Sequence, residues 1–232
     1  MPENHFLDAN VIIGSLISWD AQYDRSVRYF ETQGMFRHTS MRVYGECTGV
    51  FEASRRELLR YFKEFYRRFN QSSDPMYLDH HIQQFTAEYS AGFDDEKMKR
   101  IVDNFVRTHM TDLRNVALGG EQSFGDFQQN IRDAIKYALN ELANRCIDVE
   151  GAEIYLYDCC PIDHAPLYAT EYGMLFTSMS YAPDVNVLLD SYHIKQTHLQ
   201  STVQFITTDF THITRHKVTI ERVLPGILIF NP

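Results

Sequence analysis

The sequence predicts an α/β fold with a central, mainly parallel sheet and a helical insertion. Short apolar runs of the kind that form buried strands occur at residues 5–13, 35–40, 152–159, 203–208 and 227–230. Segments whose apolar residues recur three and four positions apart, the helical spacing, separate most of these runs. Because strands that alternate with helices form parallel sheets, we expect the carboxyl ends of the strands to share one edge.

The middle of the chain has helical patterns only. Apolar residues at intervals of three, four and seven predict a helix from Met41 to Phe69, and the polar segment 71–75 is expected to end it. Two further helical segments lie at residues 94–118 and 123–142. With 232 residues, the chain is long enough for a single domain with a long insertion. We therefore expect a core of residues 3–74 and 150–232 and a helical insertion at residues 75–150.

The composition and net charge of the chain argue against several classes of protein. A net charge of −9 argues against wide, nonspecific binding to duplex nucleic acid. No apolar run approaches the roughly 18 residues of a membrane helix, and the first residues lack the basic and apolar regions of a signal peptide. The four cysteines form neither a disulfide framework nor a zinc-binding spacing. These features predict a cytoplasmic protein with reduced thiols and no membrane partner.

Carboxylates occur where the chemistry of an α/β protein is usually located. Asp8 follows the first predicted strand, and Asp209 follows the strand at residues 203–208. Glu46 lies six residues after Ser40, about one turn into the long helix. Ligands of parallel sheets bind at the carboxyl ends of the strands, so these acids are expected to be near one another. A single acid after a strand is more often a turn residue or a helix cap.

Crowded carboxylates imply a bound cation. They repel one another and need positive charge to remain ionised. Hard oxygen ligands select Mg²⁺ or Mn²⁺. Such an ion activates water for attack on a phosphodiester and stabilises the leaving oxygen, which is the chemistry of a nuclease.

Four stretches together resemble the PIN-domain family, which includes toxin ribonucleases and ribosomal-RNA processing nucleases. They read HFLDANVII, TSMRVYGECTGVF, PDVNVLLDSYHI and FITTDFTHI. The resemblance covers about residues 3–60 and 150–232 and implies a three-layer α/β/α fold that cuts RNA with Mg²⁺ or Mn²⁺. It implies that Asp8, Glu46 and Asp209 are catalytic acids that hold the metal, and that Asn10 and Thr208 support them.

The third acid of the family pattern has two candidates. Asp184 follows Pro183 at a predicted helix start, and Asp190 lies 19 residues before Asp209, nearer the usual family distance. Six residues along a helix turn the side chain by roughly 600°, so the two acids point about 120° apart and are not expected to bind one ion together. Both stay catalytic candidates, and we favour Asp190 as the metal ligand.

The helical insertion departs from compact family members. It could cover the site, bind a partner or form a dimer, and the resemblance adds an antitoxin or other protein partner and a homodimer to the expectations. On the long helix, one basic face could meet RNA phosphates, although such a face is more often simply solvated. Its residues are Arg56, Arg60, Lys63 and Arg67.

Two other functions remain open at this stage. The chain could be a catalytically inactive PIN-like module that binds RNA or protein, or a nuclease directed at DNA. The cluster Asp158, Cys159, Cys160, Asp163 and His164 is interpreted as a strand end and loop rather than a Cys–His nucleophile pair.

Overall fold

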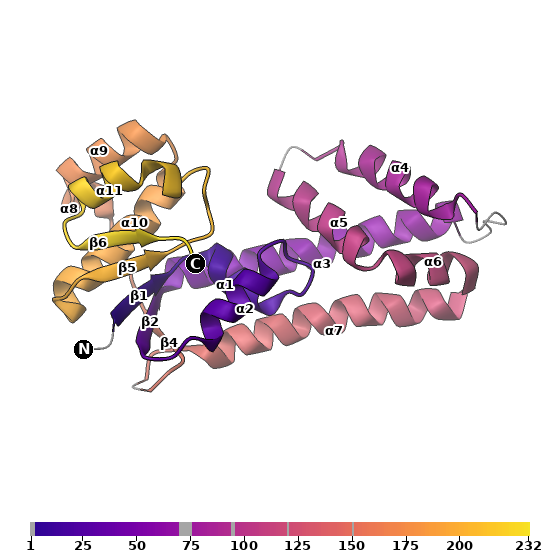
Figure 1. Cartoon of the computed structure of the whole chain (residues 1–232), viewed down its shortest axis with the longest axis horizontal. Coiled ribbons are helices and arrows are strands. Elements are labelled where there is room, and N and C mark those ends of the chain that lie inside the picture. Colours follow the sequence, from indigo (N-terminus) through magenta and orange to yellow (C-terminus); the bar gives the residue numbers. More distant parts are fainter. Residues whose placement is uncertain (1–2, 70–75, 94–95, 120, 150) are drawn as a thin grey trace. The chain divides into compact units, whose positions relative to one another are not determined.

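A computed structural model describes residues 3–69, 76–93, 96–119, 121–149 and 151–232. Six strands form one sheet in the order β3–β4–β2–β1–β5–β6, and every neighbouring pair is parallel (Figure 1). The predicted α/β class with a central parallel sheet is confirmed. The strands are β1 (Glu3–Leu7), β2 (Met35–Ser40), β3 (Cys146–Ile147), β4 (Ile154–Tyr157), β5 (Val203–Ile206) and β6 (Ile227–Phe230).

Helices connect the strands. None of them, within the described ranges, has the length and apolarity needed to span a membrane. They are α1 (Ala9–Leu16), α2 (Tyr23–Glu31), α3 (Met41–Phe69), α4 (Leu78–Ser90), α5 (Glu96–Thr108), α6 (Met110–Gly119), α7 (Glu121–Arg145), α8 (His164–Leu167), α9 (Ala169–Met179), α10 (Ala182–Ile194) and α11 (Lys217–Val223).

The largest local difference from the sequence prediction lies at residues 8–16. The predicted strand ends at Leu7 as expected, but residues 9–16, where a polar loop was expected, form α1. Asp8 causes the change, because its side-chain oxygen accepts a hydrogen bond from the backbone N–H of Ala9 and its carbonyl accepts from Val11. Hydrogen bonds of this kind are found where a helix begins. The two-residue strand β3 was not predicted, because two residues give no periodicity.

The chain divides into two compact units. A sheet unit comprises Met1–Leu16, Gln22–Thr48 and Glu141–Pro232, and a helical unit comprises Ile17–Ala21 and Gly49–Asn140. The helical unit thus includes the second half of α3, which the sequence pattern assigned to the core. The predicted helix end at residues 71–75 lies outside the described residues.

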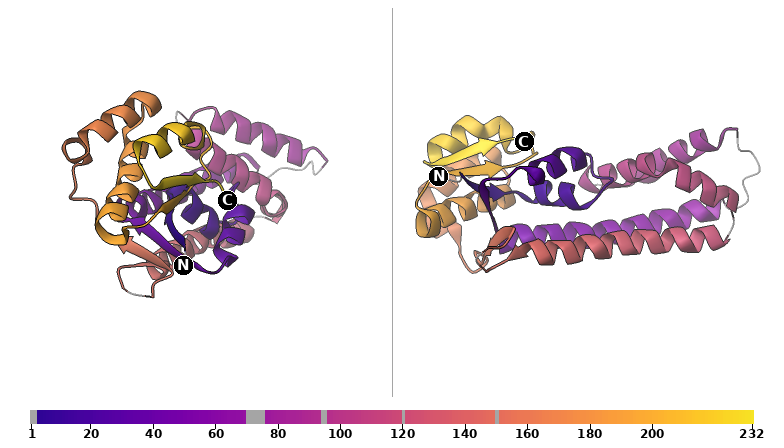
Figure 2. Two further views of the ribbon diagram at one scale, coloured as in Figure 1. Left: turned by 60° about the vertical axis from the view of Figure 1, so that its left-hand side comes forward. Right: turned by 60° about the horizontal axis from the view of Figure 1, so that its bottom comes forward.

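The sheet of the sheet unit is covered on both faces. Side chains of successive strand residues point to opposite faces, yet Phe6 and Leu7 are both fully buried, as are Phe205 and Ile206. Phe6 and Phe205 stack with ring centroids 5.5 Å apart. Helix α9 packs against both α10 and α11, and α10 contacts β2 and β5. Figure 2 shows the strands and these helices from two further directions. Because both faces of the sheet are buried, consecutive residues of a strand are apolar, and this explains the continuous apolar runs in the sequence.

The helical unit has an aromatic core of its own. Tyr61, Phe62 and Phe65 of α3 are fully buried. The ring of Phe62 lies 4.7 Å from that of Phe127 on α7. Trp19 contributes from the short segment Ile17–Ala21, with its ring edge-on to Phe105 at 5.3 Å. Aromatic pairs in these geometries add to the free energy gained from burial alone.

A buried histidine predicts how the free energy of unfolding depends on pH. His38 on β2 donates from Nε2 to Asn4 Oδ1 at 3.0 Å, and its Nδ1 accepts from the Tyr157 hydroxyl at 3.4 Å. Burial lowers the pKa of His38 from 6.5 to about 4, with a smaller contribution from His5. Between these values the unfolded chain binds the proton and the folded chain does not. Stability is therefore lost as pH falls from about 6.5 to about 4.

Substitution of His38 tests this dependence. We expect the wild-type protein to lose on the order of 2–3 kcal/mol across that pH window through this residue. The His38→Gln variant, which keeps a donor for Asn4, should lose correspondingly less in urea unfolding curves measured from pH 4 to pH 7. Equal pH slopes for the two proteins would show that His38 does not titrate in this way.

Candidate functional site

The strand order defines one topological switch point. From β1 the chain proceeds to β2 and β4 on one side of the sheet, and later to β5 and β6 on the other side. Crevices that bind ligands in open α/β sheets form at such a point, outside the carboxyl ends of the strands. Here the residues that follow these ends are Asp8, after β1, and Thr207, after β5.

Asp8 is held firmly at this position. Its side chain is buried, with 5% of the residue exposed. Oδ1 accepts from the Ala9 backbone N–H at 2.8 Å, while Oδ2 accepts from the Thr207 hydroxyl at 2.7 Å and from the Asn10 amide at 3.4 Å. These donors stabilise the negative charge and fix the orientation of the carboxylate. Asn10, which the resemblance implies as a supporting residue, thus contacts the Asp8 carboxylate.

Asp209 is linked to Asp8 through a single hydroxyl. The backbone N–H of Asp209 donates to Thr207 Oγ1 at 3.0 Å, and the same hydroxyl donates to Asp8. The Asp209 carboxylate accepts from the His212 backbone N–H at 2.9 Å, as in a helix-capping turn. Thr208, the predicted supporting residue, makes no side-chain hydrogen bond within the described parts of the chain, and Thr207 makes the contact instead. Neighbouring residues of extended backbone point in opposite directions, so only one of the two threonines can face Asp8.

Asp190 lies in a separate buried cluster. It is fully buried on α10, and its Oδ2 accepts from the Ser40 hydroxyl at 2.7 Å and from Arg42 Nε at 3.3 Å. Its Oδ1 is paired with Nε2 of the buried His164 at 2.5 Å. Both carboxylate oxygens are thus engaged by side chains from the end of β2, the start of α3 and α8. We interpret this cluster, Ser40, Arg42, His164 and Asp190, as a support for the edge of the sheet.

Sequence reasoning missed the partners of Asp190. His164 had been assigned to a loop, and Ser40 and Arg42 had no assigned role. One local signal was available for Ser40, whose hydroxyl also accepts from the Val43 backbone N–H at 3.3 Å at the start of α3. A serine whose hydroxyl accepts a hydrogen bond from the backbone N–H three residues later commonly caps the start of a helix.

The two remaining acids have different environments. Glu46 is exposed on α3, and Asp184 is partly buried in the first turn of α10.

Among the described residues, no three His, Cys, Asp or Glu side chains are grouped so that they could hold a metal ion. Mg²⁺ often takes only one or two protein carboxylates and completes its shell with water and substrate phosphates. Thr207 joins the Asp8 carboxylate to the backbone N–H of Asp209, whose own carboxylate accepts from the His212 N–H.

Cys159 does not have the properties of a nucleophile. It is buried, and burial raises the pKa of its thiol to about 12. A thiol attacks as its thiolate, which such a pKa disfavours at neutral pH.

The predicted RNA-binding face of α3 is exposed but largely paired. Arg56 and Arg60 both lie near the Glu57 carboxylate, at 3.3 and 3.8 Å, and Arg67 pairs with Glu64 at 2.7 Å. Exposed ion pairs contribute little and break readily, so these arginines remain able to meet phosphates. Lys63 is exposed as well.

Comparisons with known proteins gave no match. No family model, no curated protein and no solved structure matches the chain.

The buried pair of Asp190 and His164 predicts a large effect on stability. Asp190→Asn removes the charged acceptor of Ser40, Arg42 and His164, and leaving a buried donor without its acceptor typically costs about 1–3 kcal/mol, and more for charged groups. We expect a loss of roughly this size in the free energy of unfolding, measured in urea by circular dichroism. Asp24→Asn, the same change at an exposed position of α2, should alter it by less than about 1 kcal/mol. Similar small effects for both variants would contradict a supporting role for the cluster.

Proposed function

We propose that this chain is a cytoplasmic PIN-type endoribonuclease that hydrolyses phosphodiester bonds in RNA with Mg²⁺ or Mn²⁺. The observation that carries the proposal is the Asp8 carboxylate, which is fixed at the topological switch point and joined to the Asp209 turn by the Thr207 hydroxyl. This is the position at which an open α/β sheet binds its ligand. The resemblance of the four sequence motifs supplies the choice of reaction.

The acids divide into two groups in this proposal. Asp8 and Asp209 would hold the cation, and the exposed Glu46 would be a third ligand when RNA is present. Asp190 supports the edge of the sheet, because Arg42, Ser40 and His164 already occupy its oxygens. Asp184 remains the alternative to Asp190 as the third acid of the family pattern. When bound, the cation supplies a reactive water and stabilises developing negative charge.

The protein's own contribution is mainly orientation. Thr207 and Asn10 keep Asp8 Oδ2 in one direction, and the Ala9 N–H keeps Oδ1 in another. The hydrogen bond from Asp209 to Thr207 fixes the turn that carries the second carboxylate. Preorganised ligands of this kind avoid the cost of reorganisation during the reaction.

Cleavage of labelled single-stranded RNA tests the function. The purified protein is incubated with Mn²⁺, with Mg²⁺ and with EDTA, and single-stranded DNA is measured in parallel. We expect metal-dependent cleavage of RNA, and we expect Asp8→Asn to slow it by roughly 100-fold or more, because the substitution removes the central negative charge. Asp24→Asn, with the same change of charge on α2, should cleave at the wild-type rate.

Two outcomes would replace the proposal. Cleavage that persists in Asp8→Asn would exclude this site as the catalytic centre. No cleavage by folded protein under any metal would favour the second candidate, an inactive PIN-like module that binds RNA or protein. The full engagement of Asp190 by other side chains is the observation that favours this candidate. An antitoxin or other protein partner and a homodimer belong to the proposal through the resemblance alone.

A further inference from the structure

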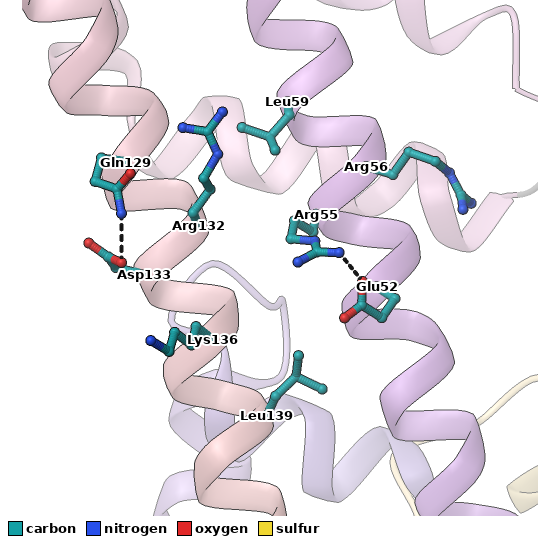
Figure 3. A pocket seen from close by; sticks show the side chains of 9 residues that line it. All are labelled: Glu52, Arg55, Arg56, Leu59, Gln129, Arg132, Asp133, Lys136 and Leu139. Atoms are coloured by element: carbon teal, nitrogen blue, oxygen red, sulfur yellow. Dashed lines mark hydrogen bonds and ion pairs between the residues drawn. The ribbon is translucent and has the colours of Figure 1, made fainter.

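A groove runs between two helices of the helical unit. The second half of α3 lies beside α7, and the two helices leave a cavity of about 740 Å³ between them (Figure 3). Leu59 and Leu139 provide the apolar part of its lining, and the other seven residues are polar or charged. Those seven are Glu52, Arg55, Arg56, Gln129, Arg132, Asp133 and Lys136.

The groove carries an excess of positive charge. Its four cations, two from each helix, outnumber the carboxylates of Glu52 and Asp133. This local excess occurs in a chain whose net charge is −9. The excess belongs to the groove alone, because residues 49–140 as a whole contain 13 Lys and Arg against 14 Asp and Glu. The groove is therefore suited to an anionic ligand rather than to a cation.

Two guanidinium groups face the space between the helices. Figure 3 shows Arg55 and Arg132 directed into it from α3 and α7, whereas Arg56 and Lys136 extend away from it. Arg55 pairs with Glu52 at 2.6 Å, one turn away on the same exposed face. Arg132 forms no ion pair with any residue in the described parts of the chain, and the nearby Asp133 carboxylate accepts from Gln129 at 2.9 Å.

This geometry matches a phosphate group. The planar guanidinium fork donates two parallel hydrogen bonds to phosphate oxygens, and it loses little hydration when it does so. Arginines on opposite walls can hold one phosphate between them or two successive phosphates of a chain.

We propose that this groove binds the phosphodiester backbone of single-stranded RNA through Arg55 and Arg132. RNA as the ligand follows from the proposed function, but binding here does not require cleavage. The proposal adds α7 to the RNA-binding surface and replaces the face of α3 expected from the sequence with residues on the opposing walls of the groove. The proposed function makes a nucleic acid the expected occupant, and an acidic peptide is the alternative outcome of the test.

Binding of a short, fluorescently labelled oligouridine tests the proposal. The full chain with Asp8→Asn is used in EDTA, so that no cleavage interferes, and fluorescence anisotropy is measured over a range of salt concentrations. The variant Arg55→Gln/Arg132→Gln keeps helix-forming side chains and removes both guanidinium groups. We expect its Kd to rise about 10-fold or more. The slope of log K against log salt should fall by roughly 1.4, or about 0.7 for each lost phosphate contact to a single strand.

A matched control separates the groove from general electrostatics. Arg100→Gln/Arg107→Gln makes the same change of charge at two exposed positions of α5 that do not line the cavity. We expect this variant to bind like the parent. An equal loss in both variants, or no loss in the groove variant, would overturn the proposal. So would displacement of the RNA by polyglutamate of equal charge, which would indicate a site for acidic peptides.

The result is independent of the cleavage assay. RNA cleavage without binding in the groove would leave the nuclease proposal intact and reject the groove. Groove-dependent binding without cleavage would support the groove and reject the nuclease proposal.

Discussion

The hydrogen bonds of the Asp8 carboxylate are the constraint on which the centre of the sheet unit depends. A buried charge is costly unless donors surround it, and Asp8 obtains its donors from the start of α1 and from the residue that follows β5. The carboxylate therefore ends the first strand, begins the first helix and ties together the two strands that flank the switch point. Any ligand that enters at this edge meets a preorganised acid.

A second buried acid has a different role because its surroundings are different. Asp190 receives a hydroxyl, a guanidinium and an imidazole from three separate elements, so that its charge is satisfied inside the protein. Asp8 receives mainly backbone and neutral donors beside the proposed ligand position. Two aspartates that look equivalent in a motif are distinguished by what compensates their charge. Carboxylates near a site need not all be metal ligands.

The helical unit has the ingredients of a binding module in its own right. Its core is built from stacked aromatic rings such as those of Phe62 and Phe127, and it does not draw on the sheet for them. Once this core is formed, the outer faces of α3 and α7 are free to carry charge. The opposed guanidinium groups of Arg55 and Arg132 are a consequence of this packing. The proposed catalytic site and the proposed RNA-binding groove therefore lie in different units, and each can be tested without the other.

The sequence by itself determined the elements that have a regular apolar pattern along their whole length. The 29 residues of α3 and the six of β2 were predicted with their observed bounds, because regular apolar spacing over a whole element depends only on neighbouring residues. The position of Asp8 after the first strand was also correct. Tertiary structure alone decided which side chains meet. In the fold, Thr207 rather than Thr208 contacts Asp8, Asp190 pairs with His164, and Arg132 lies opposite Arg55. Strand direction and helix packing bring these residues together. No local sequence pattern connects residues that are so far apart along the chain.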